Sequence, residues 1–452
     1  MTTPGTGGSA EVRISLLEGM TVQQPPEYLA PRQGGPMKLV LEKNGRRVGF
    51  NDDYLSRHVL FLGGIGTGKS NTMYQFLDQL RRTASGDDVF VVFDTKGDFR
   101  ERFYRPGDAV LSSTPDQDAG GVIWNLFADL LARDRAERAE QVHEVATTVF
   151  SDALSQSEQN KFFAMGARDI FVAVTEAMCR KQESSTSQES FTNDDLRSQL
   201  EQDPADLLDL LAEEQNEDLA GTARYLQGEG STPDSILAFL EQTLSETFAG
   251  TFQRPGDFSV RDFVRRKGGR ALFVEYDIAS GSRLLPVYRV LIDLAIKEAL
   301  GLGRAGAPGS VYFVLDEFAL LPKLSHISNG INFGRSLGLK FLVGTQNVAQ
   351  VQNAYGPQVA NSILSGFGTV LAFRLMDDSS RNLVRQRFGT NRKQISTYAH
   401  VRSEGVHQLV ITGNVIEDWV LSGLAVGQCV LSLPDGPPYF FAFDEHQPRK
   451  PG

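Results

Sequence analysis

Short runs of apolar residues recur along much of the chain, and between several of them apolar residues return every three or four positions. The runs are typical of buried β-strands and the longer spacing is typical of amphipathic helices. Because the two patterns alternate, they predict an α/β fold with a mainly parallel central sheet. The expected strands are residues 58–62, 89–93, 271–274, 311–315, 341–343, 370–373, 429–433 and 439–443.

The middle of the chain has a different pattern. Residues from about 128 to 264 carry little strand signal and repeated helical periodicity, which predicts an inserted all-helical domain. A polar tract at 181–193 interrupts it and is interpreted as a mobile surface loop, with a recognition segment as the alternative. The expected helices are residues 130–154, 158–178, 194–211 and 236–248.

The sequence on either side of these regions completes the predicted domain organisation. Residues 1–36 are rich in Gly, Pro, Thr and Gln around one apolar stretch, and they predict a flexible N-terminal extension or a partner-binding arm. Residues 38–50 read as a β-hairpin, because Asn44-Gly45 is a pair that tolerates positive φ. The predicted domains are therefore the extension 1–36, a sheet domain formed by 37–127 and 265–446, the helical insertion 128–264, and a tail 447–452.

Composition and charge narrow the class of protein. Of 452 residues, 41% are hydrophobic and 22% charged, which is ordinary for a globular protein. The net charge of −11 argues against a surface that coats nucleic acid without specificity, yet it permits a motor that touches DNA with a few basic residues. Cys179, Cys429 and six scattered histidines support neither a disulfide framework nor a zinc site. With no apolar run of about 18–20 residues and no signal peptide, a cytoplasmic location is expected.

A glycine-rich stretch after the strand 58–62 carries the clearest chemistry. It matches G-x-x-x-x-G-K-[ST], and helical periodicity follows it, so a strand, a loop and a helix N-terminus occur in the order that binding of nucleoside triphosphate requires. The lysine supplies charge to the phosphates and the serine hydroxyl can ligate Mg²⁺. The predicted ATP contacts are Gly63, Gly64, Ile65, Gly66, Thr67, Gly68, Lys69, Ser70 and Asn71.

Polar residues follow three further strands. Asp316 and Glu317 end the run 311–315, where Asp316 can hold Mg²⁺ and Glu317 can polarise an attacking water. Gln346 follows the run 341–343 and can sense the γ-phosphate or orient water, unless it is a solvated strand end. Asp94 follows the run 89–93. The carboxyl ends of parallel strands share one edge of a sheet, which is where open α/β sheets bind ligands.

Phosphoryl transfer also calls for a further cation. Arg335 is the first candidate and Arg57 the second, although either position also fits a surface arginine. A basic cluster after the strand 370–373 can meet DNA phosphates or lie at a subunit interface or on a solvated helix face. Its members are Arg381, Arg385, Arg387, Arg392 and Lys393.

The combined motifs resemble the TraD/TraG/VirD4-type coupling ATPases of conjugation and type IV secretion, within the FtsK/HerA class of RecA-like motors. The resemblance spans about residues 38–443 and rests on residues 58–70, 91–98, 124–127, 315–321 and 334–346. It implies a RecA-like P-loop core with an inserted all-α domain, a homohexamer, ATP and Mg²⁺. It implies phosphate and Mg²⁺ binding by Lys69 and Ser70, Mg²⁺ and water roles for Asp316 and Glu317, nucleotide sensing by Gln346, and an Arg335 that acts in trans. Arg57 is similar in position to a family arginine near the nucleotide.

The chain departs from the family pattern at two places. It has a polar extension where membrane-bound coupling proteins carry transmembrane helices, which leaves membrane anchoring and export of a relaxosome open. Leu126 stands where the family commonly has proline, which alters only a local turn. We expect an ATP-driven DNA translocase of conjugative transfer, cytoplasmic or peripheral at the inner face of the membrane, with a relaxase or secretion partner. The alternatives are a HerA-like motor partnered with a nuclease in repair or defence, and an ATP-controlled recruitment platform for type IV secretion.

Overall fold

In the computed structural model the chain forms two compact units. The described residues are 11–33, 35–113, 120–131, 133–155, 158–185, 190–227, 231–278, 281–398 and 406–447, so most of the predicted tail 447–452 lies outside them. Unit 1 contains residues 1–79, 344–353 and 367–452, and unit 2 contains residues 80–343 and 354–366.

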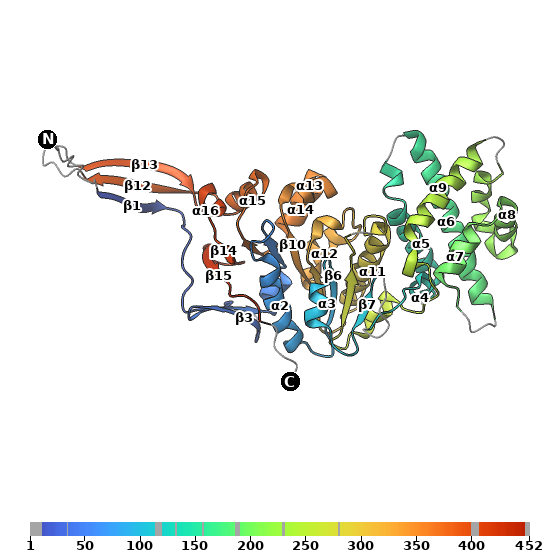
Figure 1. The fold of residues 1–452 in the computed structure, drawn as a ribbon, viewed down its shortest axis with the longest axis horizontal. Coiled ribbons are helices and arrows are strands. Elements are labelled where there is room, and N and C mark those ends of the chain that lie inside the picture. Colours follow the sequence, from blue (N-terminus) through green and yellow to red (C-terminus); the bar gives the residue numbers. More distant parts are fainter. Residues whose placement is uncertain are drawn as a thin grey trace, which may run out of the picture. The chain divides into compact units, whose positions relative to one another are not determined.

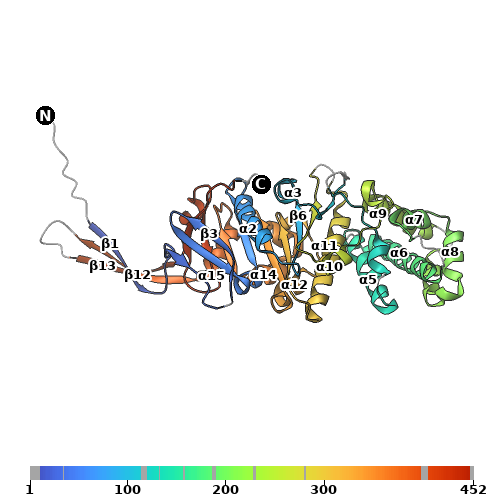
Figure 2. The same cartoon turned by 90° about the horizontal axis from the view of Figure 1, so that it is seen from below.

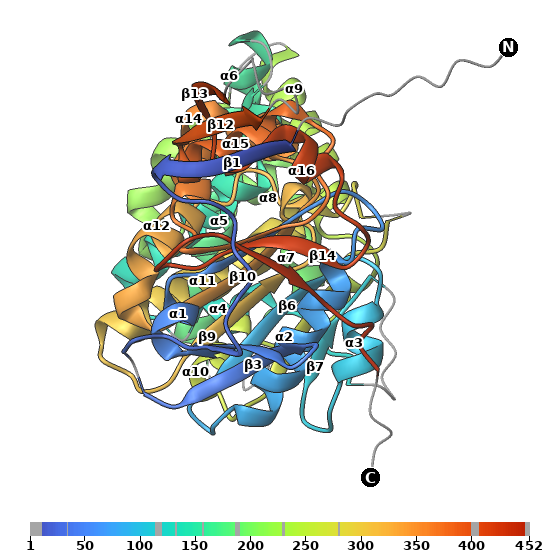
Figure 3. The ribbon, with the colours of Figure 1, turned by 90° about the vertical axis from the view of Figure 1, so that its left-hand side faces the viewer.

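Unit 1 contains one part of the main sheet, with the strand order β15-β14-β11-β5. β5 and β11 are parallel, whereas β14 is antiparallel to both β11 and β15. The helix α2 (Lys69–Thr83) follows β5, and β3 lies beside it (Figure 3), where Val40 N donates to Gln79 Oε1 at 2.9 Å. The strands are β5 (Val59–Leu62), β11 (Thr369–Ala372), β14 (Gln428–Ser432) and β15 (Tyr439–Ala442).

Two smaller sheets complete the strands of unit 1. The predicted hairpin is confirmed: β3 (Met37–Lys43) and β4 (Arg46–Asn51) pair antiparallel around Asn44 and Gly45, whose φ angles are 52° and 74°. β2 (Tyr28–Leu29) pairs with β4. The other sheet has the order β1-β12-β13 (Figure 1) and consists of β1 (Glu11–Glu18), β12 (Thr390–Tyr398) and β13 (Val406–Asn414).

These sheets correct the prediction of a flexible extension over residues 1–36. β1 and β2 both lie within that range, and β1 pairs antiparallel with β12 from Glu11 to Glu18. The pairing partner is more than 370 residues away in the sequence, so local composition carries no trace of it. A single strand in water is not stable without a partner strand. Because residues 1–36 contain no evident partner for β1, their sequence pattern predicted an extension.

Unit 2 contains the other part of the main sheet, in the order β10-β9-β6-β8-β7, and its neighbouring strands are parallel. β10 runs through both units, with residues 339–343 in unit 2 and 344–345 in unit 1. Each predicted run forms a strand, and β7 is an addition that the sequence pattern missed. The strands are β6 (Val89–Asp94), β7 (Ala109–Leu111), β8 (Ala271–Glu275), β9 (Val311–Leu315) and β10 (Leu339–Thr345).

The named elements between residues 126 and 266 are all helices (Figure 2). They share unit 2 with β6–β10, which differs from the predicted separation into a sheet domain and an insertion. Ion pairs join the two regions, with Arg133 to Glu298 at 3.1 Å and Arg289 to Asp152 at 2.8 Å. The α-helices are α4 (Leu126–Leu130), α5 (Arg135–Val149), α6 (Glu158–Ser184), α7 (Asn193–Leu200), α8 (Pro204–Ala212), α9 (Ser231–Thr247) and α10 (Val260–Arg266), with 3₁₀ turns η2 (Ala153–Ser155), η3 (Glu214–Tyr225) and η4 (Gly250–Phe252).

The base of this helical region is fixed by the segment 124–127. Asn193 Oδ1 accepts from Leu126 N at 2.9 Å, and Asn193 Nδ2 donates to Trp124 O at 2.8 Å and Phe252 O at 3.0 Å. Trp124 Nε1 donates to the buried carboxylate of Asp129 at 2.7 Å. The predicted mobile loop 181–193 therefore ends in a fully buried residue that holds three chain segments together.

The remaining elements connect the strands of the two units. Within the described residues, none of the helices combines the length and the apolar content that crossing a membrane requires. The elements are α1 (Asp52–Ser56), α3 (Asp98–Phe103), α11 (Leu285–Arg304), η5 (Phe318–Leu320), α12 (Ile327–Phe333), η6 (Gly334–Leu337), α13 (Val348–Tyr355), α14 (Pro357–Ser365), α15 (Asp378–Phe388) and α16 (Asp418–Ser422).

Candidate functional site

The glycine-rich loop connects β5 to α2 in unit 1, and hydrogen bonds fix its backbone. Gly63 N donates to Thr345 O at the end of β10 (3.2 Å), and Gly427 N, just before β14, donates to Thr67 O (2.9 Å). Within the loop, Thr67 Oγ1 donates to Gly64 O at 2.8 Å. The loop is thus held in shape by segments that lie far from it in the sequence.

Several glycines of this loop occupy positions that other residues fit poorly. Gly66 and Gly68 have φ angles of +70° and +103°, the left-handed region that side chains rarely adopt. A Cβ on Gly63 would lie 2.7 Å from Phe373 Cβ, and one on Gly68 would lie 3.0 Å from Gly427. A loop of this kind turns successive N–H groups toward one side, which is the geometry that holds an anion.

The residues after the loop open α2. Lys69 is 8% exposed and Ser70 is partly buried, so both lie at the helix N-terminus next to the loop. The nucleotide contact of Asn71 stays a prediction. Its side-chain Nδ2 donates to Asp444 O at 2.8 Å and its Oδ1 accepts from His446 N at 2.6 Å, so its amide anchors the C-terminal segment.

The structure places Gln346 close to the loop within unit 1. It follows Thr345, whose carbonyl accepts the hydrogen bond from Gly63 N. Gln346 is half-buried at this position. An amide at this end of β10 is in the neighbourhood where it would meet a phosphate group on the loop.

Arg57, in contrast, lies away from the loop of its own chain. It precedes β5, whereas the loop follows β5, and the four extended residues of this strand at roughly 3.3 Å each separate the two ends by about 13 Å. Arg57 also forms an ion pair with Asp53 at 3.1 Å. A direct contact between Arg57 and phosphates on its own loop is therefore excluded by the fold.

The acidic pair lies in unit 2 at the carboxyl end of β9. Asp316 is 5% exposed and Glu317 is 8% exposed, and Asp316 N donates to Phe93 O at 3.3 Å. Thr95 Oγ1 donates to Asp316 Oδ2 at 2.9 Å. Sequence reasoning missed this contact, although the signal was present, since Thr95 directly follows a strand that ends at the same edge as β9.

Asp94 adds a third buried carboxyl group at this edge. Burial raises its pKa to about 6, and the negative charges of Asp316 and Glu275 act in the same direction. Hydrogen bonds from Arg100 N (2.9 Å) and Lys96 N (3.3 Å) to the carboxylate oppose the increase. The edge therefore concentrates negative charge, which suits a divalent cation.

Arg335 lies at the other edge of the sheet of unit 2. It is an exposed residue of η6, which precedes the start of β10 at Leu339, and Leu339 pairs with Val311 at the start of β9. The acidic pair follows the far end of β9. Arg335 and the acidic pair of one chain therefore lie at opposite ends of parallel strands.

The basic cluster after β11 is engaged within unit 1. Arg385 forms an ion pair with Asp418 at 2.9 Å, Arg381 pairs with Asp378, and Arg387 donates to Ser432 Oγ at 2.7 Å. Burial lowers the pKa of Arg387. Arg392 and Lys393 lie on β12 with the carboxylates of Glu18 and Glu417 at 3.4 and 4.0 Å. These contacts favour a structural role for α15 over direct DNA contact.

Comparison with known proteins assigns the chain to a family. Residues 46–412 match the model of the type IV secretion-system coupling protein DNA-binding domain. The chain belongs to this family. The match includes the glycine-rich loop, the acidic pair and Gln346.

Two curated proteins are similar to this coupling-protein domain. The chain is 24% identical over 324 residues to the coupling protein TraD of Escherichia coli strain K12, which covers 69% of the chain and 41% of TraD. It is 23% identical over 284 residues to the conjugal transfer protein TraG of Agrobacterium fabrum strain C58, which covers 58% of the chain and 40% of TraG. The chain thus spans about two fifths of the length of these relatives.

Solved structures of the bacterial conjugative coupling protein TrwB share the fold. The unbound TrwBΔN70 structure superimposes with a TM-score of 0.73 at 19% identity and covers 100% of this chain and 99% of that one. TrwB complexes with the non-hydrolysable GTP analogue GDPNP and with ADP and Mg²⁺ match with TM-scores of 0.73 and 0.70 at 18% identity, each covering 99% of this chain and 98% and 99% of those chains. The predicted α/β fold with a helical region is confirmed.

Proposed function

We propose that this coupling-protein family member is an ATPase that moves DNA in conjugative transfer as a homohexameric ring. The observation that carries the proposal is the loop 63–70, which lies inside the family match and has glycines where a Cβ would clash or force strain. The fold shared with TrwB, which has been solved with nucleotides, supports the same reading.

The residues present suit ATP and Mg²⁺. The backbone N–H groups of the loop and the Lys69 ammonium would hold the phosphates, while the Ser70 hydroxyl and the Asp316 carboxylate are oxygen ligands of the kind that Mg²⁺ prefers. When bound, Mg²⁺ neutralises charge on the phosphates and ATP supplies a phosphoanhydride bond for hydrolysis. Glu317 would accept a proton from the attacking water, and Gln346 would sense the γ-phosphate.

The two arginines fit this proposal only in trans. Arg57 lies at the amino end of β5 and Arg335 near the amino end of β10, whereas the phosphate loop and the acidic pair follow the carboxyl ends of their strands. Each arginine would therefore reach a nucleotide that is bound to a neighbouring copy. A ring of identical subunits supplies such a neighbour for every site.

The proposal is tested by steady-state ATP hydrolysis with and without single- and double-stranded DNA, at two salt concentrations and across protein concentration. We expect DNA to stimulate hydrolysis and the specific activity to rise steeply with protein concentration, because the arginines come from another subunit. Lys69→Ala is the control and should abolish turnover, since it removes the phosphate-binding charge. A rate that DNA leaves unchanged would contradict the motor and favour a recruitment platform.

A further inference from the structure

The sheet formed by β1, β12 and β13, which we call the arm, projects from the rest of unit 1 (Figure 1, Figure 2). Within the described residues, β1 and β13 pair only with β12, so each has one edge that is not paired with another strand. The two edges are similar in length, at eight residues for Glu11–Glu18 and nine for Val406–Asn414. Each copy of the chain thus presents two open strand edges on one sheet.

One face of the arm carries an exposed apolar row. Ile14 of β1 lies opposite Ile395 of β12, which lies opposite Leu409 of β13. Residues directly opposite each other in an antiparallel sheet share a face, so these three side chains form one row. Ile14 is 66% exposed and Leu409 is 60% exposed. Leu16 and Ile411 lie two residues further along on the same face. The apolar row therefore reaches both open edges of the arm.

The strand β13 lacks the features with which natural edge strands avoid pairing. Its sequence, Val-His-Gln-Leu-Val-Ile-Thr-Gly-Asn, contains no lysine, arginine, acidic residue or proline. Charged residues and prolines on an edge strand discourage pairing with another chain. Val410 lies on the opposite face from Leu409 and is also 48% exposed, so β13 is open on both faces as well as at its edge. Such a strand is a template for a further strand.

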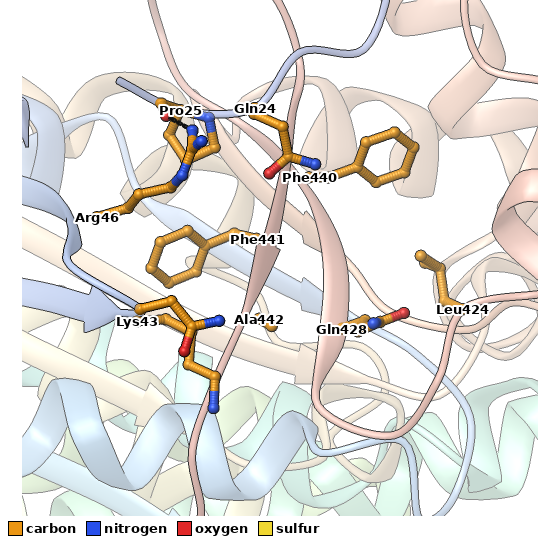
Figure 4. Close-up of a pocket in the computed structure, with 10 residues that line it drawn as sticks. Gln24, Pro25, Lys43, Arg46, Leu424, Gln428, Phe440, Phe441 and Ala442 are labelled. Atoms are coloured by element: carbon orange, nitrogen blue, oxygen red, sulfur yellow. Dashed lines mark hydrogen bonds between the residues drawn. The ribbon is translucent and has the colours of Figure 1, made fainter. Parts of the chain in front are cut away.

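The arm is anchored at its base, which gives its edges a fixed direction within unit 1. Asn391 Nδ2 of β12 donates to Met20 O, just after β1, at 2.8 Å. The following residues run beside β15, and there Arg46 Nη1 donates to Pro25 O. Figure 4 shows Pro25 and Arg46 at the wall of a cavity of about 280 Å³ that Phe440 also lines. An element that is already ordered loses less conformational entropy when a partner docks on it.

A second copy of the chain offers both a strand and a matching apolar row. β1 and β13 both run antiparallel to β12 and are therefore parallel to each other. A copy rotated about the axis of a ring would bring its β1 alongside β13 in the same direction, with Ile14 beside Leu409. The charged residues of β1 would then adjoin a strand with no acidic or basic residue, so no like charges would meet. Contact between two different edges is heterologous, which is the kind of interface that builds rings.

We propose that the arm is an interface between copies of this chain, in which β1 of one copy pairs with β13 of the next and extends the sheet around the ring. Main-chain hydrogen bonds between the strands supply the affinity, and burial of the apolar row fixes the register. The interface rests on the proposed homohexamer and adds to it a contact that is independent of the trans arginines. It also gives residues 11–18 a role in assembly.

Disulfide trapping tests the interface directly. Ser15 and Val410 share a row, because each lies opposite Gln394. Within one copy β12 separates them by about 9.6 Å, which exceeds the roughly 7 Å that a disulfide can bridge, whereas in the proposed joint they are neighbours in adjacent copies. On mild oxidation with Mg²⁺-ATP and DNA present, Ser15→Cys/Val410→Cys should form a reducible ladder of up to six chains. The native Cys179 and Cys429 are buried and should not contribute.

The matched controls are Ser15→Cys alone and Val410→Cys alone, which should give no ladder. Dimers of either single variant in place of a ladder from the double variant would show a two-fold contact of like edges and overturn the proposal. An uncrosslinked double variant, with a wild type that assembles in sedimentation velocity, would overturn the arm interface and leave the hexamer standing. A wild type that stays monomeric with Mg²⁺-ATP and DNA would contradict both.

A second variant measures the contribution of the apolar row. Leu409→Asp places a charge in the row and should raise the protein concentration at half-assembly by about 10- to 100-fold, because burial of a leucine side chain is lost. Val359→Asp, at an exposed apolar position of α14 in unit 2, is the control and should assemble as the wild type does. Thermal unfolding checks that both variants fold. Normal assembly of Leu409→Asp would overturn the proposal, and if its binding to phosphatidylglycerol vesicles were also lost, the face would belong to a membrane surface instead.

Discussion

At the scale of single residues, the Thr95 hydroxyl orients the carboxylate that we assign to Mg²⁺. It donates to Asp316 Oδ2 at 2.9 Å, and both side chains are buried. Groups that orient a metal ligand commonly change metal affinity or activity by 10- to 100-fold when they are removed. Thr95 is thus a positioning residue, since its contact is with the ligand.

We expect Thr95→Val to raise the Mg²⁺ concentration that supports half-maximal ATP hydrolysis by roughly 10-fold, because Asp316 loses its hydrogen bond. Thr95→Ser keeps the hydroxyl and should restore the wild-type Mg²⁺ dependence. The measurement is a Mg²⁺ titration of the hydrolysis rate at saturating ATP. Equal Mg²⁺ dependence in the valine and serine variants would show that the hydrogen bond does not position the ligand.

The raised pKa of Asp94 predicts how the free energy of unfolding changes with pH. Its pKa is raised to about 6 in the folded protein, above the usual value of about 4, so the folded state holds a proton that the unfolded state has released between pH 4 and 6. The unfolding free energy should therefore fall as pH rises through this window and level off above it. Asp293, whose pKa burial also raises to about 6, contributes in the same direction.

Asp94→Asn should flatten this dependence, with a change of at most about 3 kcal/mol across the window, because the amide does not titrate. Urea unfolding at pH 4, 5, 6 and 7 measures it. The part of the pH dependence that comes from Asp293 should persist in the Asp94→Asn variant. A slope identical to that of the wild type would mean that Asp94 is already ionised at pH 4.

At the scale of elements, the segment 124–127 is a structural anchor. Asn193, at the first turn of α7, bonds to backbone groups of Trp124, Leu126 and Phe252 and is fully buried. Thr192 caps α7 through a reciprocal pair with Asp195, which fixes where the helix begins and so places Asn193. The segment 124–127 therefore anchors α7 and the residues around Phe252 within unit 2.

Asn193→Ala should destabilise unit 2, at about 1–3 kcal/mol for each buried backbone group left without its partner. Differential scanning calorimetry should show a lower transition temperature, and limited proteolysis should cut faster near the polar tract that precedes α7. The control is Asn353→Ala, an exposed position in α13. An unchanged transition temperature would show that water replaces the hydrogen bonds of the Asn193 amide with no loss of stability.

At the scale of the whole molecule, the strands separate groups that the proposed ATP hydrolysis needs. The loop 63–70 and the acidic pair follow the carboxyl ends of β5 and β9, whereas Arg57 and Arg335 precede the amino ends of β5 and β10. Within a single copy, therefore, neither Arg57 nor Arg335 lies at the carboxyl ends of the strands. In the ring that we propose, a neighbouring copy would supply an arginine there.

Mixing experiments test that inference. Arg335→Ala and Lys69→Ala should each be inactive alone, and a mixture should regain a fraction of the activity, because an intact arginine of one subunit can meet an intact loop of another. Arg304→Ala removes an exposed arginine of α11 in unit 2 and should hydrolyse ATP normally. Absence of any recovery across mixing ratios would place Arg335 outside the site or within a single subunit.

The sequence by itself determined the features whose physics is local. Runs of buried apolar residues predicted every strand of the main sheet except β7, and the glycine pattern with Lys69 and Ser70 predicted the loop that we propose binds phosphate, because strand, turn and helix signals lie within a few residues of one another. The acidic pair and Gln346 followed from their places at strand ends. Asn44-Gly45 gave the hairpin, since its positive φ angles are set within the turn.

Tertiary structure decided everything that depends on contacts between distant segments. The pairing of β1 with β12, the hydrogen bond from Thr95 to Asp316, the buried anchor at Asn193 and the cavity beside β15 each join segments far apart in the chain. The positions of Arg57 and Arg335 at the amino ends of strands also required the topology. These contacts form when the chain buries apolar surface and satisfies its backbone, and no local pattern specifies which distant partner does so.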